Sequence, residues 1–79
     1  MTDDGEAIKR RIEKDIAMFG DSVKDVVAND PVSGHVLELA KDYASDANSY
    51  LGKRDFYTAF ASISYAHGLL DALKELEKR

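Results

Sequence analysis

The sequence contains no cysteine and no tryptophan, and a single proline among its 79 residues. Without cysteine the chain can form neither disulfides nor thiolate metal sites. No apolar run approaches the ~20 residues that a membrane-spanning helix needs, so we expect no membrane partner. The N-terminal segment is acidic and lacks the basic and apolar regions of a secretory signal. A cytoplasmic location is therefore expected.

Positive charge is also in short supply. Lysine and arginine together number 11 against 15 aspartate and glutamate residues, which gives a net charge of −4. Nucleic-acid-binding domains usually carry a basic field, so this balance argues against a nucleic-acid partner. The apolar share of 44% and the charged share of 33% are typical of a globular protein. The length suits one domain, 1–79, whose small core gives modest stability.

Strand-type alternation is absent, and apolar residues instead recur at steps of three and four in three segments. The sequence therefore predicts an all-α fold with helices near 4–28, 33–51 and 55–77. The apolar stripe of the first segment keeps its phase across Gly20, which indicates one continuous helix. Short connections favour an antiparallel, up-down-up three-helix bundle.

The boundaries of the second and third helices carry recognisable capping residues. Asp30 could cap the second helix with Pro31 at its first position, or Ser33 could be the cap instead. Gly52 is placed to end that helix in a left-handed turn. Asp55 is a good N-cap for the third helix.

The third helix has two apolar stripes, which predicts that it contacts both other helices. The first stripe comprises Phe56, Phe60, Ile63, His67 and Leu70. The second comprises Tyr65, Leu69, Ala72 and Leu76. We expect the first helix to cover this second stripe. The alternative is that the second stripe is an interface for a homodimer or a partner protein, which would help to stabilise so short a chain.

A polar constellation accompanies the third helix. His67 falls on its apolar side, Asp71 lies one turn further on, and Asp46 and Asp15 lie at the edges of the other apolar faces. A carboxylate could orient the imidazole as a general base or a metal ligand. A metal site needs three or four ligands, however, and His35 is expected far away. We therefore favour a hydrogen-bonded core histidine that fixes helix register, and assign no catalytic, metal or cofactor site.

Two further residues need an explanation. Gly68 costs about 1 kcal/mol relative to alanine inside a helix, and we expect it to allow close packing rather than the approach of a ligand. Tyr57 falls off the main stripe and is expected to be exposed. Beside Lys53 and Arg54 it could stack on a nucleotide base, but the acidic surroundings favour a solvated turn.

Two signatures carry a family resemblance: Y-x-x-D-A at Tyr43–Ala47 and Y-A-H-G-x-L-D-A at Tyr65–Ala72. Over roughly residues 36–76 the chain resembles the archaeal family of short helical proteins catalogued as domain of unknown function 357. The resemblance implies an archaeal, cytoplasmic protein and supplies no activity. It marks five signature positions: Asp46, Tyr65, His67, Gly68 and Asp71.

A looser likeness is to helical domains found beside minimal nucleotidyltransferases, some of which are ribonucleases with an arginine a few residues before a histidine. The nearest preceding arginine here is Arg54, in the turn before the helix, so the nuclease pattern is not matched. The sequence thus predicts a small protein-interaction or homodimerisation module. The alternative is a ligand-binding or weakly catalytic domain, related to nucleotides or RNA, centred on Asp46, His67 and Asp71.

Overall fold

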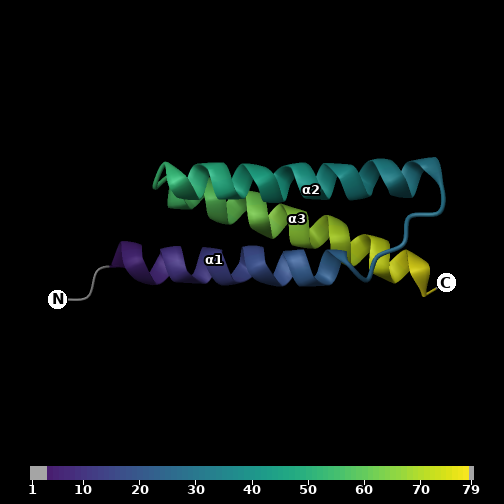
Figure 1. Ribbon diagram of the computed structural model, residues 1–79, viewed down its shortest axis with the longest axis horizontal. Coiled ribbons are helices and arrows are strands. Elements are labelled where there is room, and N and C mark those ends of the chain that lie inside the picture. The colour runs from purple at the N-terminus through teal and green to yellow at the C-terminus, as the bar shows by residue number, and fades with distance from the viewer. Residues whose placement is uncertain (1–3, 79) are drawn as a thin grey trace.

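Three helices make up the computed structural model, which describes residues 4–78 and contains no strand in that range. The helices are α1 (Asp4–Val23), α2 (Pro31–Gly52) and α3 (Phe56–Glu77). They run up, down and up, with α3 lying between the other two (Figure 1). The predicted all-α class and topology are confirmed.

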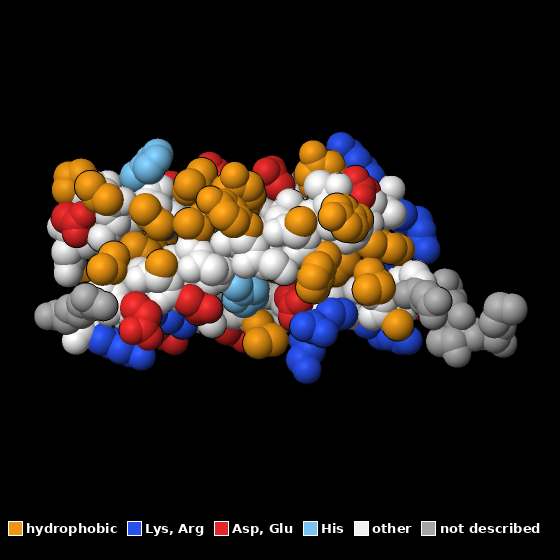
Figure 2. Space-filling view, turned by 180° about the vertical axis from the view of Figure 1, so that it is seen from behind, with side chains coloured by type: hydrophobic (Ala, Val, Ile, Leu, Met, Phe, Trp, Pro, Cys, Tyr) orange, Lys and Arg blue, Asp and Glu red, His pale blue; other side chains and the backbone are white. Residues whose placement is uncertain are grey.

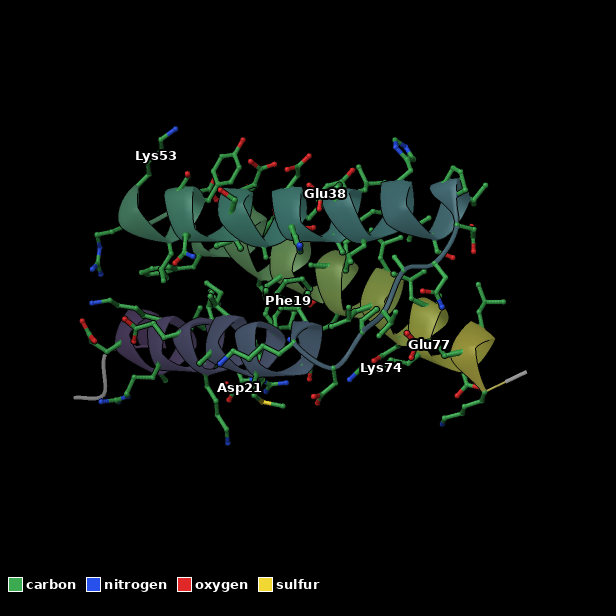
Figure 3. The ribbon with its side chains drawn as sticks, turned by 45° about the vertical axis from the view of Figure 1, so that its right-hand side comes forward. Phe19, Asp21, Glu38, Lys53, Lys74 and Glu77 are labelled. Carbon is green, nitrogen blue, oxygen red and sulfur yellow. The ribbon has the colours of Figure 1, made fainter. Side chains whose placement is uncertain are left out.

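The third helix is the centre of the fold. Both α1 and α2 pack along α3, whereas α1 and α2 hardly touch each other. The wide apolar surface of α3 follows from this arrangement, because each of its flanks is covered by a different helix. The largest fully buried side chains are Ile12 of α1 and Ile63 and Leu70 of α3. Phe19 points from α1 toward the interior (Figure 3).

Alanine dominates the contact between α2 and α3. Ala40, Ala44 and Ala47 of α2 are buried, as are Ala59 and Ala66 of α3. Their steps of three, four and seven residues keep them on one face of each helix. Small side chains at a helix contact allow a short interaxial distance, so this core is held by close approach rather than by bulky residues.

The first helix ends at Val23, five residues earlier than the predicted boundary at 28. The physical reason is the topology: α1 and α2 flank α3 on opposite sides, so the connection must cross the end of α3 (Figure 1). One bond ties this connection down: the backbone N–H of Val27 donates to Oε1 of Glu77 at 2.8 Å. Glu77 lies beside the connection in Figure 3. The helix does continue through Gly20, as predicted.

The second helix begins in the first of the two predicted ways. Asp30 has an extended backbone, and its carboxylate accepts the Ser33 N–H at 2.9 Å and the Ser33 hydroxyl at 3.0 Å. Pro31 is the first helical residue, where its missing N–H costs nothing. The alternative start at Ser33 is wrong. The hydrogen bonds from Ser33, the backbone one first, lower the pKa of Asp30 from its ordinary value.

The turn between α2 and α3 corrects another prediction. Gly52 is still helical, and the left-handed residue is Arg54, with φ of 62°. The N–H of Arg54 donates to the Leu51 carbonyl and that of Asp55 to the Tyr50 carbonyl, both at 3.0 Å. This pair of bonds is a Schellman motif, which places the left-handed residue two positions later than predicted. Asp55 caps α3 through the Thr58 N–H at 3.2 Å, as expected.

Candidate functional site

His67 joins two helices through the main chain. Its Nε2 atom lies 2.8 Å from the backbone carbonyl oxygen of Asp15, in the middle of α1. A carbonyl oxygen only accepts, so Nε2 carries the proton and donates. The edge of the ring packs against Phe19, with centroids 5.8 Å apart and planes at 87°. The half-buried imidazole therefore fastens α3 to α1 with one hydrogen bond and one aromatic contact.

The other members of the polar constellation lie elsewhere. Asp46 and Asp71 are exposed on α2 and α3, and within residues 4–78 neither carboxylate makes a hydrogen bond or an ion pair. Asp46 does not supply the partner of His67, because the ring turns toward α1 and not α2. Asp15 supplies its backbone carbonyl, while its carboxylate pairs with Arg11 at 3.3 Å.

A metal site has no support among the described residues, where no group of three or more His, Asp or Glu side chains is arranged to hold an ion. His35 is exposed near the start of α2 and does not approach His67. The constellation is thus a structural contact at His67 with two separate surface carboxylates. A backbone acceptor leaves no mark in a sequence, since every residue offers the same carbonyl group.

The second apolar stripe of α3 is only partly covered. Leu69 is half-buried and packs against the core, but Tyr65 is 53% exposed, Leu76 is 60% exposed, and Ala72 is also on the surface. The neighbour of this stripe is α2 rather than α1: the Tyr65 and Tyr43 rings meet edge to face at 4.6 Å. The predicted cover by the first helix is therefore wrong.

The outer face of α3 carries no charge over most of its length. From Phe56 to Leu70 the sequence has no Asp, Glu, Lys or Arg. Tyr57 is 88% exposed and Phe60 is 40% exposed on this face. Figure 2 looks onto it and shows hydrophobic and other uncharged side chains over its middle, with charged side chains toward its margins.

Gly68 lies on the same face and has no packing role within the described chain. A Cβ atom built there would meet nothing within 4 Å. The expectation that Gly68 admits a neighbouring helix of its own chain is therefore wrong. The glycine costs about 1 kcal/mol of helix stability, and no close contact among residues 4–78 offsets that cost.

An apolar hollow of about 360 Å³ lies between the first turns of α1 and α3. It is lined by Gly5, Ile8, Phe56, Tyr57 and Phe60. The guanidinium groups of Arg11 and Arg54 lie 5.9 and 5.0 Å from the ring centroids of Phe60 and Phe56. Such a hollow can accept an apolar side chain from outside. The sequence reasoning missed it, although the aromatic residues after Asp55 were a signal.

Comparison with known proteins identifies a family. The model of a family described as "Protein of unknown function (DUF357)" matches residues 11–78, a longer span than the signatures alone cover. No curated protein and no solved structure matches the sequence. Among the described residues, no helix combines the length and apolar character needed to cross a membrane.

Proposed function

The chain belongs to the DUF357 family of proteins of unknown function, and we propose that it acts as a homodimerisation module through the outer face of α3. The observation that carries this proposal is the absence of charge on an exposed helix face. A solvent-facing helix surface normally carries charged residues, whereas this one presents Tyr57, Phe60 and Tyr65 to water. Contiguous exposed apolar surface of this kind marks interaction sites.

The available area suits a second copy of the chain. The side chains of Tyr57, Phe60 and Tyr65 are 88%, 40% and 53% exposed. At roughly 200 Å² for a whole aromatic side chain, these three rings offer about 350 Å². A standard interface buries about 800 Å² per partner, so three side chains supply almost half of it. The residues between them contribute further area.

The modest core gives a second reason for pairing. Among the described residues, half of the ten buried hydrophobic ones are alanines, and helices of about 20 residues lie side by side with little contact between α1 and α2. Small domains of this kind commonly gain stability by oligomerisation. The ligand-binding alternative has less support, because Asp46, His67 and Asp71 do not converge on one point.

Sedimentation of the whole chain tests the proposal. We expect a species of twice the 8.8 kDa chain mass at concentrations up to about 1 mM, which detects association free energies as weak as ~4 kcal/mol. Tyr65→Lys should weaken association about tenfold or more, because it places an unpaired charge in the interface.

Met18→Lys is the matched control, since Met18 is 50% exposed on α1 and lies outside the proposed face. It should leave association unchanged. Circular dichroism would establish that both variants keep their helices. A chain that stays monomeric at the highest concentration, or equal weakening by both substitutions, would overturn the proposal.

A further inference from the structure

We infer that the two copies pair through antiparallel α3 helices, about a two-fold axis between Ala61 and Ser64. This inference rests on the proposed homodimer and adds its orientation and register. Tyr57 of each copy then faces Gly68 of the other, and Arg54 faces Asp71.

The contact follows a regular seam. Exposed residues of α3 recur at alternating steps of four and three, so they form one stripe along the helix. The α3 helix of a second copy, slightly inclined to the first, can contact this stripe along its length. The seam consists of Tyr57, Ala61, Ser64, Gly68, Asp71 and Glu75. Its first four members are uncharged, and its last two are acidic. The small residues at its centre allow the two helix axes to come close.

Charge selects the orientation. The turn before α3 is basic, with Lys53 and Arg54, whereas the seam ends in Asp71 and Glu75. A parallel pair would set each of these charges against its own copy, and like charges repel across an interface. An antiparallel pair instead sets Arg54 of one copy against Asp71 of the other, whereas Glu75 keeps its ion pair with Lys78 of its own chain. A two-fold symmetric contact of this kind is self-complementary, as a homodimer interface must be.

Charge also selects the register. Of the antiparallel registers that match the seam with itself, two have their axis among its small residues. An axis between Ser64 and Gly68 would set Ala61 against Asp71 and Tyr57 against Glu75, so that carboxylates would be buried against apolar surface at high cost. An axis between Ala61 and Ser64 leaves Asp71 beyond the uncharged part of the seam. That second register keeps the uncharged residues together.

Size complementarity supports the same register. Tyr57 is the most exposed large hydrophobic residue on this face, at 88%. Glycine at position 68 lowers helix stability, and a Cβ atom there would meet nothing within 4 Å among the described residues. Facing each other across the interface, the projecting ring fills the space that the glycine leaves. This contact accounts for the glycine at position 68, for which packing among the described residues gives no reason.

The pair formed by Arg54 and Asp71 offers a direct test. Neither side chain has an ion-pair partner within the described residues. Arg54 lies in the turn before α3, and the helix from Phe56 to Asp71 alone spans about 22 Å at 1.5 Å per residue, which exceeds the Debye length of about 8 Å. Any electrostatic coupling between them must therefore act between two copies.

Charge reversal should show this coupling in the dimer dissociation constant. We expect Arg54→Asp and Asp71→Arg each to weaken the dimer about three- to tenfold, and the double variant to restore it to within about twofold. Aspartate suits position 54 because it tolerates the left-handed backbone. As control, Asp21→Arg on α1 should not rescue Arg54→Asp. A double variant no tighter than the weaker single one would overturn the register.

Disulfide trapping tests the register independently, because the natural chain has no cysteine to interfere. In a thiol–disulfide buffer, Tyr57→Cys mixed with Gly68→Cys should give covalent dimers of the mixed pair, and neither variant alone should do so. Bridging by each variant alone would show a parallel dimer. Bridging of Tyr57→Cys with Glu75→Cys would show the other register. Either result overturns the inference and leaves the homodimer standing, whereas a strictly monomeric chain overturns both.

Discussion

The imidazole of His67 hydrogen-bonds to the backbone of α1 rather than to one of its side chains, since its Nε2 atom donates to the carbonyl oxygen of Asp15 at 2.8 Å. The bond joins positions 52 residues apart and is the one described side-chain hydrogen bond between α1 and α3. Because α1 has fewer contacts with α2 than with α3, its position in the bundle depends mainly on α3. This bond therefore fixes the register and the rotation of α1 against α3.

Removal of the imidazole should destabilise the bundle. We expect His67→Ala to lower the free energy of unfolding by about 1–3 kcal/mol, because it removes the hydrogen bond to the Asp15 carbonyl oxygen and the packing on Phe19. Urea unfolding followed by circular dichroism measures this change.

Asp15→Ala separates the backbone from the side chain. It keeps the carbonyl and removes only the ion pair with Arg11, whose side chain is largely exposed, so we expect a loss of at most about 1 kcal/mol. Equal losses in the two variants would mean that the Asp15 carboxylate, and not the carbonyl, carries the interaction.

The sequence predicts the elements well and their contacts poorly. The three helices, the Asp55 cap and the place of His67 on the apolar side follow from periodicity and capping chemistry, which are local. The partner of His67 does not, because it is a backbone carbonyl and depends on how α1 rotates against α3. The pairing of Tyr65 with Tyr43 likewise depends on how α2 rotates against α3.

The misplaced boundaries have related causes. The apolar stripe of α1 runs on to Val27, yet the helix stops at Val23 because the chain must cross the end of α3. The left-handed turn falls at Arg54 rather than Gly52 because α2 continues through the glycine and closes with a Schellman motif. Residue preferences indicate how each helix ends, and the topology determines the residue at which it ends.

Gly68 and Gly20 make a matched pair for a helix-propensity test. Both lie inside helices, both are exposed, and a Cβ at either would meet nothing within 4 Å. We expect Gly68→Ala and Gly20→Ala each to raise the stability of the monomer by about 0.5–1 kcal/mol, measured in dilute solution.

At high concentration the two glycine variants should differ. Gly68→Leu should weaken the proposed dimer, because its side chain would occupy the space assigned to Tyr57, whereas Gly20→Leu should not. Sedimentation of the two leucine variants makes the comparison. Identical association would contradict the role given to Gly68.

The left-handed backbone at Arg54 predicts an unusual order of stabilities. Glycine adopts φ of 62° without the steric cost of about 1 kcal/mol that other residues bear. The free energy of unfolding of Arg54→Gly should therefore lie within about 1 kcal/mol of that of the natural chain, although the variant loses the contact with Phe56. Arg54→Val should lose about 1–2 kcal/mol, since a branched Cβ fits this conformation worst. Thermal unfolding in dilute solution would rank the three chains. Valine equal to glycine would show that the turn is not left-handed.

Asp30 should make the start of α2 sensitive to acid. The hydrogen bonds from the Ser33 backbone and hydroxyl favour its charged form in the folded chain, so the pKa of Asp30 lies below its unfolded value. A lowered pKa contributes stability that is complete above the unfolded value and is lost as the pH falls through the folded one. Asp30→Asn keeps a capping oxygen but cannot titrate, so its melting temperature should approach that of the natural chain only as the pH falls below about 4. Melting temperatures of both chains, recorded from neutral pH down through that range, measure the gap between them. A gap that stays constant with pH would show that the Asp30 carboxylate does not hold the Ser33 amide in solution.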